Sequence, residues 1–271
     1  MSRITHALKE GLRKVLPVGI FSAIRWGWWY STFYFGRQVR AVIITERPVV
    51  RGEGDLVSEV GAVNVARPTD LCRIMTRNGS DKGAGWHTYT TVYAPLLARK
   101  ADEPVRIFEL GIGTGTPGIA ASMGTHSFPG ASLRGWRDWF RNAEVYGADI
   151  DRTVLFAETR IQTFYCDQLD AETIRSMWAQ PALQAPFDVM IDDGLHTYEG
   201  NACFLVNSLG RVRRGGLYIV EDILSTALHH WHAYILKHRE ERPQDEIVLA
   251  QLPSPINNYD NNLLIIRKGD H

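Results

Sequence analysis

The sequence predicts an α/β protein with a doubly wound, mostly parallel sheet of seven strands and a small N-terminal accessory region. From residue 104 onward, apolar runs of strand length alternate with stretches of helical pattern. Glycines or acidic residues follow several of these runs. Because alternating strands and helices form right-handed βαβ units, the carboxyl ends of the strands should meet at one edge of the sheet. We therefore expect an accessory region at 1–65 and the α/β domain at 66–271.

Seven apolar runs are predicted to form the sheet. They lie at 105–110, 144–148, 161–165, 188–191, 217–220, 246–252 and 262–267. Helices are predicted between them at 118–123, 152–159, 171–178, 198–212 and 226–239. An earlier helix should begin after Thr69-Asp70, whose side chains can cap it, and end at Asn78-Gly79. A further strand is predicted at 41–45 in the accessory region.

The connection between the first two strands is long. Forty positions separate Glu109 from Asp149, against roughly twenty from loop to ribose acid in minimal nucleotide-binding units. The excess falls on residues 130–140. We expect these to form a surface excursion with a short amphipathic piece, either as a packed loop or as an oligomer contact or rim over a cofactor.

Composition and charge limit the kinds of partner and compartment. The 30 Lys and Arg residues balance the 30 Asp and Glu residues, and 45% of residues are apolar. Such a balance is typical of a soluble globular protein and gives no reason to expect nucleic acid as a partner. The three cysteines, Cys72, Cys166 and Cys203, form no CxxC pair. This argues against a disulfide framework or a zinc site and indicates a reducing cytoplasm.

The segment 16–36 is rich in aromatic residues but contains Pro17 and Arg25. A charge at the centre of a spanning helix costs about 2.5–3.5 kcal/mol, so a transmembrane span is the least favoured of three interpretations. A core or oligomer-packing segment is favoured most. A peripheral membrane contact stays open because Trp and Tyr suit the membrane interface. We expect the protein to be a homo-oligomer.

A glycine loop follows the first strand of the α/β domain, in the segment FELGIGTGTPG at 108–118. Gly111 and Gly113 allow a tight turn and the close approach of a ligand. The glycines alone also fit the dinucleotide pattern GxGxxG. However, Glu109 suits a cationic, hydroxyl-bearing ligand better than a pyrophosphate. Pro117 also lacks the amide that a bound phosphate would use.

Acidic residues also end the next two strands. Asp149 is placed to bind two ribose hydroxyls, and Asp167 with Gln168 can contact the edge of an adenine. With Glu109, this gives one acid at each of three successive strand ends, which resembles the class I fold that binds S-adenosylmethionine. We therefore favour S-adenosylmethionine as cofactor over a nicotinamide or no cofactor. Taken alone, Asp149 or Asp167 could simply cap a helix.

Four carboxylates and an imidazole follow the fourth and fifth strands. Asp192, Asp193 and His196 end the fourth strand, and Glu221 and Asp222 end the fifth. Carboxylates this close repel one another unless a cation lies between them. An all-oxygen set of ligands selects a hard cation such as Mg²⁺. We predict a divalent site at Asp193, Glu221 and Asp222, although Asp193 or Asp222 could instead cap a helix.

These residue types suit methylation of a hydroxyl group. A sugar hydroxyl has a pKa far above 7, and a metal that holds two adjacent hydroxyl oxygens lowers that pKa. His196 can then accept the proton, because a histidine titrates near neutral pH. The alternative for His196 is a capping or packing role.

Several segments resemble the metal-dependent sugar O-methyltransferases of macrolide tailoring, the mycinamicin and macrocin O-methyltransferase group. They are FDVMIDDGLHTYEGN at 187–201, RRGGLYIVED at 213–222 and NYDNNLLIIRK at 258–268. Upstream, NGSDKG at 78–83 with His87, Tyr89 and Tyr93 is similar to the group's GSDKG…HxYT…Y segment. The resemblance covers about residues 75–267.

The resemblance implies roles for particular residues. Asp193, Glu221 and Asp222 would bind Mg²⁺, His196 would be the general base, and Asp192 would face the cofactor.

The resemblance also places Ser80, His87 and Tyr89 near the methionine end of the cofactor or the substrate entrance. We expect Ser80 and Tyr89 at the cofactor, and a weaker substrate contact from His87 and from Tyr198. Tyr259 lies in a polar loop before the last strand, which either forms a simple turn or contacts the substrate.

The predicted function is therefore Mg²⁺-dependent O-methylation, with the methyl group passing from S-adenosylmethionine to a sugar hydroxyl. The sugar would belong to a glycosylated natural product or a surface glycan. Two alternatives stay open: methylation of a non-sugar diol such as a catechol, and a cofactor-binding accessory protein for a partner oxidase. Expected partners are the glycosylated small molecule and copies of the same chain.

Overall fold

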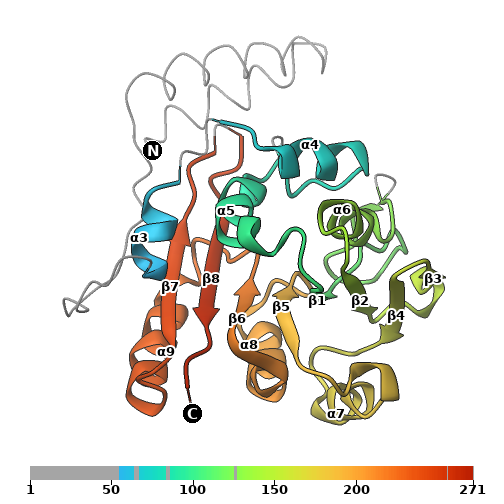
Figure 1. The fold of residues 1–271 in the computed structure, drawn as a ribbon. Coiled ribbons are helices and arrows are strands. Elements are labelled where there is room, and N and C mark those ends of the chain that lie inside the picture. The colour runs from blue at the N-terminus through green and yellow to red at the C-terminus, as the bar shows by residue number, and fades with distance from the viewer. Residues whose placement is uncertain (1–54, 64–66, 84–85, 125–126, 255, 271) are drawn as a thin grey trace, which may run out of the picture. The chain divides into compact units, whose positions relative to one another are not determined.

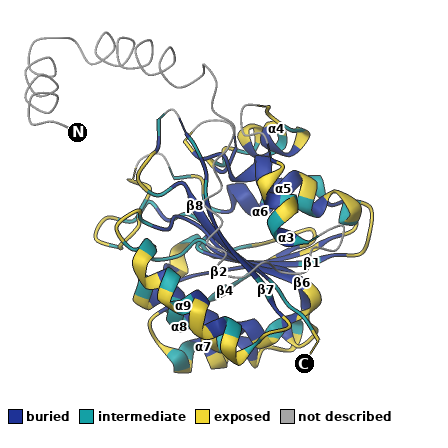
Figure 2. Cartoon of the chain, turned by 90° about the vertical axis from the view of Figure 1, so that its left-hand side faces the viewer, coloured by how far each residue is buried: buried dark blue, intermediate teal, exposed yellow. Residues whose placement is uncertain are grey.

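The computed structural model describes residues 55–63, 67–83, 86–124, 127–254 and 256–270. Within these ranges a mixed sheet is covered by helices on both faces (Figures 1 and 2). The predictions for 16–36 and 41–45 lie outside the described residues. In the described part of the chain, no helix is both long and apolar enough to cross a membrane.

The sheet has eight strands in the order β3-β4-β2-β1-β5-β6-β8-β7. The strands are β1 (Arg106–Leu110), β2 (Glu144–Asp149), β3 (Ala157–Glu158), β4 (Ile161–Tyr165), β5 (Phe187–Asp192), β6 (Val212–Val220), β7 (Glu246–Gln251) and β8 (Asn262–Arg267). The central five, β4, β2, β1, β5 and β6, are parallel, and the other three pair antiparallel. The doubly wound α/β fold is confirmed. The seven predicted strands are all present, and the additional strand is the two-residue edge strand β3.

Helices pack on both faces of the sheet (Figure 2). One face carries α3 (Leu56–Gly61), α4 (Asp70–Arg77), α5 (Tyr89–Leu97) and α6 (Ala131–Trp139). The other carries α7 (Ala171–Trp178), α8 (Tyr198–Ser208) and α9 (Leu228–Glu241). The helices expected near 70–78, 171–178, 198–212 and 226–239 are therefore confirmed. As expected, the Thr69 hydroxyl caps α4 by accepting a bond of 3.3 Å from the Cys72 amide.

The first crossover differs from the prediction. The expected helix at 118–123 is wrong, because the chain makes turns there, with positive φ at Gly118 (86°) and Ala121 (57°). The crossover helix is instead α6, within the segment that we expected to be a surface excursion. It packs Leu133 and Trp136 into the core, both fully buried. The helix expected at 152–159 is also absent: a 3-10 turn at Arg152–Val154 and the edge strand β3 take its place.

Helix α3 lies before the boundary that we predicted at 65 and 66, yet it packs in the core of the sheet domain. Leu56 and Val60 are buried in the same apolar cluster as Val248 of β7. The Leu56 amide donates to Glu246 Oε1 at 3.0 Å. The α/β domain therefore includes α3, and an accessory region stays a prediction for residues outside the described ranges.

Candidate active site

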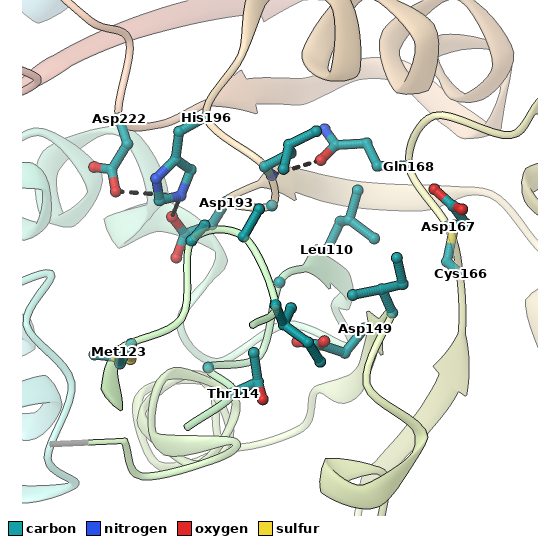
Figure 3. A pocket seen from close by; sticks show the side chains of 18 of the residues that line it. Leu110, Thr114, Met123, Asp149, Cys166, Asp167, Gln168, Asp193, His196 and Asp222 are labelled. Carbon is teal, nitrogen blue, oxygen red and sulfur yellow. Dashed lines mark hydrogen bonds and ion pairs between the residues drawn. The ribbon is translucent and has the colours of Figure 1, made fainter. Parts of the chain in front are cut away.

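A cavity of about 300 Å³ lies at the carboxyl ends of the central strands (Figure 3). This is the edge at which doubly wound sheets bind ligands. The predicted site residues that line it are Gly111, Gly113, Asp149, Asp167, Gln168, Asp193, His196 and Asp222.

The sheet register brings the acidic strand ends together. Leu110 of β1 pairs with Asp192 of β5, which pairs in turn with Val220 of β6. The pattern continues past the strands, because the Asp193 amide donates to Leu110 O and the Glu221 amide to Asp192 O, each at 2.9 Å. The two acidic tips therefore lie side by side next to the glycine loop.

Gly111 is required by this close approach. Its φ is 82°, and a Cβ at this position would lie 1.9 Å from the carbonyl oxygen of Asp193. An L-residue would meet both backbone strain and a collision. The loop after β1 can therefore reach the end of β5 only with glycine here.

Asp149 holds the glycine loop from β2. Its carboxylate accepts from the amides of Ile112 (3.0 Å) and Asp151 (2.9 Å), and burial raises its pKa. Asp151, which sequence reasoning missed, accepts from the hydroxyls of Thr114 (2.5 Å) and Thr116 (2.6 Å). These hydroxyl bonds lower the pKa of Asp151. The loop is thus fixed at both ends of its turn.

Gln168 and Asp192 bind each other. The Gln168 amide nitrogen donates to both oxygens of Asp192 (2.7 and 2.9 Å), and its Oε1 accepts from the Leu195 amide (2.7 Å). Burial raises the pKa of Asp192 to about 7. The polar atoms of Gln168 therefore position the loop after β5, and the predicted adenine contact stays a prediction. Asp167 accepts from the Leu169 amide at 3.0 Å and lines the cavity.

Glu109 is buried on the α6 side of the loop. It accepts from the Ser132 hydroxyl and, at 2.6 Å, from the Trp136 indole. Lys82 Nζ lies 3.6 Å from its Oε1. Glu109 does not line the cavity of Figure 3, so its predicted contact with the cofactor stays a prediction.

His196 lies between two carboxylates, as Figure 3 shows. Its Nε2 is 3.3 Å from Asp193 Oδ1 and 3.4 Å from Asp222 Oδ2. Burial lowers the pKa of His196, but the two carboxylates outweigh it and raise the pKa to about 10. His196 and Asp222 both have positive φ, at 60° and 52°, a strain that proteins retain mostly at functional sites.

The same three residues form a group of potential ligands for a divalent cation. Asp193, His196 and Asp222 each offer one ligand atom, and these atoms lie within 4.8 Å of one another. His196 Nε2 is buried, and it contacts the carboxylates of both Asp193 and Asp222. Carboxylates suit a hard cation such as Mg²⁺ better than an imidazole does, so Asp193 and Asp222 are the members of this group that fit it.

Glu221, the third predicted ligand, has other partners. Its Oε1 accepts from the Tyr93 hydroxyl at 2.5 Å, and its Oε2 accepts from Lys82 Nζ. Lys82 also donates to Asp193 Oδ2 at 2.5 Å. Sequence reasoning assigned no role to Lys82, although a buried cluster of acids requires a counter-charge and the residue belongs to the NGSDKG segment.

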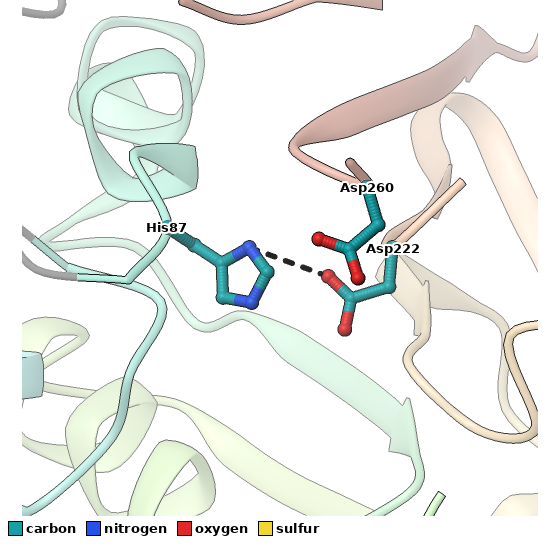
Figure 4. A group of neighbouring side chains, drawn as sticks. All are labelled: His87, Asp222 and Asp260. Carbon is teal, nitrogen blue, oxygen red and sulfur yellow. Dashed lines mark ion pairs between the residues drawn. The ribbon is translucent and has the colours of Figure 1, made fainter. Parts of the chain in front are cut away.

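A second group surrounds the other side of Asp222 (Figure 4). His87 Nδ1 is 3.4 Å from Asp222 Oδ1, and with Asp260 the three residues form another group of potential ligands. However, the Asn257 amide nitrogen lies between them, 2.6 Å from Asp260 Oδ1 and 3.3 Å from His87 Nδ1. The Tyr89 hydroxyl donates to Asp222 Oδ1 at 2.5 Å. His87 and Tyr89 therefore lie at the acidic cluster.

The remaining predicted residues lie around the periphery. Ser80 lines a smaller cavity of about 30 Å³ with Gly111 and Gly113. Tyr198 stacks on His230, with ring centroids 5.0 Å apart, and Tyr259 is 60% exposed. Neither tyrosine lines either of these two cavities. Their substrate contacts stay predictions.

No family model matches the sequence, but curated proteins do. The chain is 34% identical over 169 residues to the 8-demethyl-8-(2-methoxy-alpha-L-rhamnosyl)-tetracenomycin-C 3'-O-methyltransferase of Streptomyces olivaceus. It is 30% identical over 169 residues to the mycinamicin VI 2''-O-methyltransferase of Micromonospora griseorubida. Each match covers 62% of this chain, but only 39% and 38% of the respective relative. The chain thus spans about two fifths of the length of the relatives that it matches.

A solved structure gives a consistent result. The MycE methyltransferase from the mycinamycin biosynthetic pathway, in complex with Mg and SAH, is 27% identical with a TM-score of 0.56. The alignment covers 75% of this chain and 55% of MycE. The chain therefore has the class I methyltransferase fold and is homologous, over the matched region, to sugar O-methyltransferases.

Proposed function

We propose that the chain is a Mg²⁺-dependent O-methyltransferase that moves a methyl group from S-adenosylmethionine to a sugar hydroxyl of a glycosylated natural product. One observation carries the proposal: a single cavity extends from Asp149 and Asp167 to Asp193, His196 and Asp222. Methyl transfer requires donor and acceptor in direct contact and in line, so both must occupy one cavity.

The relatives support the choice of acceptor. The S. olivaceus and M. griseorubida proteins are named for methylation of hydroxyls on rhamnosyl-tetracenomycin and mycinamicin. MycE was solved with Mg and SAH. The same cofactors suit the strand-end acids and the acidic cluster of this chain.

On the donor side, Gly111 and Gly113 line the cavity, and their backbone would allow the cofactor to approach closely. Asp149 would bind the ribose hydroxyls, although its carboxylate also holds the loop. Asp167 would contact the adenine from the end of β4. The mutual bonds of Gln168 and Asp192 hold this part of the cavity in shape.

On the acceptor side, Asp193 and Asp222 would hold Mg²⁺, with Glu221 as the third ligand. The cation would lower the pKa of the acceptor hydroxyl and fix its orientation. Without a cation, Asp193 and Asp222 raise the pKa of His196 to about 10. A cation bound to these carboxylates would offset their charge and lower that pKa, and His196 Nε2 would then take the hydroxyl proton. The carboxylates stabilise the imidazolium that forms, and such general-base assistance contributes about 10²–10⁴-fold to the rate.

The test is a methyl-transfer assay with S-adenosylmethionine and 8-demethyl-8-alpha-L-rhamnosyl-tetracenomycin C, the acceptor for which another relative is named. We expect a methylated sugar, loss of turnover with EDTA and recovery with Mg²⁺. Undiminished turnover in EDTA would contradict the metal-dependent mechanism. Turnover of catechols but not of the sugar would show that the acceptor is a non-sugar diol. Cofactor binding without turnover of any diol would favour the role of an accessory protein.

A further inference from the structure

Lys82 takes part in the acidic cluster in a way that the proposed chemistry does not use. We propose that its ammonium group occupies the position between Asp193 and Glu221 until a divalent cation binds, and that Glu109 then receives the displaced ammonium. This exchange rests on the proposed function, because it presupposes a divalent cation at the cluster.

The ammonium group of Lys82 is buried between two of the proposed metal ligands. Lys82 is only 2% exposed, and its Nζ bonds to Asp193 Oδ2 and Glu221 Oε2. These two residues are two of the three proposed ligands of Mg²⁺. A single ammonium there offsets charges that would otherwise repel in a buried space. The ammonium and the cation therefore compete for the same carboxylates.

Glu109 offers a second carboxylate with which the displaced ammonium group can pair. Glu109 is fully buried, and its Oε1 lies 3.6 Å from Lys82 Nζ. Ser132 and Trp136 of α6 hold this carboxylate in place. A short movement of the flexible lysine side chain would keep it paired, so displacement does not leave a buried charge without a partner.

Two tyrosine hydroxyls, and not only Lys82, hold the carboxylates of Glu221 and Asp222 in place. The Tyr93 hydroxyl holds Glu221 Oε1, and the Tyr89 hydroxyl holds Asp222 Oδ1, both at 2.5 Å. Both tyrosines are buried in α5. The carboxylates of Glu221 and Asp222 therefore keep their positions when the ammonium leaves, and Lys82 acts as a competitor rather than as their support.

Cation affinity in the absence of S-adenosylmethionine tests the exchange. Binding of Mn²⁺ is measured by electron paramagnetic resonance and of Mg²⁺ by calorimetry, in the full chain and in Lys82→Met. Removing one competing positive charge should tighten binding by about tenfold or more. The matched control is Lys100→Met, since Lys100 pairs with Asp188 at 3.5 Å, outside the cluster, and its affinity should equal that of the wild type. Unchanged or weaker binding by Lys82→Met overturns the exchange.

Glu109→Gln tests the second half of the proposal. Without this acceptor, displacement of the ammonium becomes less favourable, so Mn²⁺ should bind more weakly than to the wild type. The effect should vanish when Lys82 is already Met, because the two residues then no longer interact. An equal loss in both backgrounds would overturn the role of Glu109.

A measurement on the wild type covers the case in which Lys82→Met does not fold. Of the four described lysines (82, 100, 237 and 268), only Lys82 is buried. Its ammonium protons should exchange slowly enough to give a ¹⁵N NMR signal that shifts on addition of Mg²⁺. A Lys82 ammonium signal that does not shift when Mg²⁺ is added would contradict the displacement of the ammonium by the cation. A wild type that binds neither cation contradicts the proposed function itself, and so the two failures are distinguishable.

Discussion

Individual side chains at the tips of β5 and β6 decide the chemistry of the site. The sequence could predict the acids and His196, because the acids directly follow apolar runs, His196 lies three residues past one of them, and parallel strands end at one edge. It could not assign the partners of each carboxylate. Lys82 reaches Asp193 and Glu221 across 111 and 139 positions of the sequence, and only the packing of its segment over the sheet brings it there.

Removal of the proposed base should slow methyl transfer without disturbing the donor side. We expect His196→Ala to lower kcat by about 10²–10⁴-fold, because no other described imidazole lies between Asp193 and Asp222. The affinity for S-adenosylmethionine, measured by calorimetry, should stay near that of the wild type. The control is His229→Ala on the exposed surface of α9, which should leave kcat unchanged. Near-normal turnover by His196→Ala would exclude it as the base.

Alanine substitutions at two glycines with similar φ distinguish the cost of backbone strain from the cost of a steric collision. Gly111 and Gly118 have φ of 82° and 86°, but a Cβ would collide with Asp193 only at Gly111 and would meet nothing within 4 Å at Gly118. Gly118→Ala should therefore cost about 1–3 kcal/mol, the cost of the strained backbone alone. Gly111→Ala should cost clearly more. Urea unfolding of both variants measures the difference, and equal losses would show that the loop does not approach β5 this closely.

At the scale of elements, the predictions of α4 and α7 were confirmed where a capping residue precedes an apolar helix face. Thr69 before α4 and Asp170 before α7 both accept a hydrogen bond from the first turn of the helix. The prediction of the first crossover was wrong. It placed the crossover helix at 118–123, where the chain makes turns, and the helix is instead α6. Helix α6 has a glycine without a capping side chain before it and another glycine inside it. Its helical state depends on burial of Trp136 against the core, which local sequence does not show.

The contact between α9 and the loop before β7 should make stability depend on pH. His238 Nε2 lies 2.9 Å from Asp245 Oδ2, and burial, which outweighs the carboxylate, lowers the pKa of His238. The unfolded chain then binds this proton more tightly. The contribution of His238 is therefore present above about pH 6.5, the ordinary value of histidine, and is lost as the pH falls below it.

Thermal unfolding between pH 8 and pH 5.5 tests this dependence. We expect Tm of the wild type to fall more over this range than Tm of His238→Gln, which carries no titrating group at that position. His230→Gln serves as the control, because His230 is an exposed residue of the same helix, and it should follow the wild type. Parallel curves for wild type and His238→Gln would contradict the lowered pKa.

At the scale of the whole molecule, the alternation of strands and helices was sufficient to predict the doubly wound sheet. Among the strands of the described residues it missed β3 alone, because two residues carry no detectable period. The domain boundary was less predictable, since Leu56 and Val60 of α3 are buried against β7 far away in the sequence. The likeness to MycE extends over 75% of this chain, which agrees with the predicted fold class.

The central proposal is that one cavity holds the methyl donor beside a hydroxyl-activating cation. A crystal structure with Mn²⁺ and SAH, with the anomalous signal of manganese recorded, tests it most directly. We expect the manganese peak within ligand distance of Asp193 and Asp222, and SAH in the same cavity beside Asp149. Manganese bound elsewhere, for instance between His87 and Asp260, or SAH bound away from Asp149, would contradict the proposal.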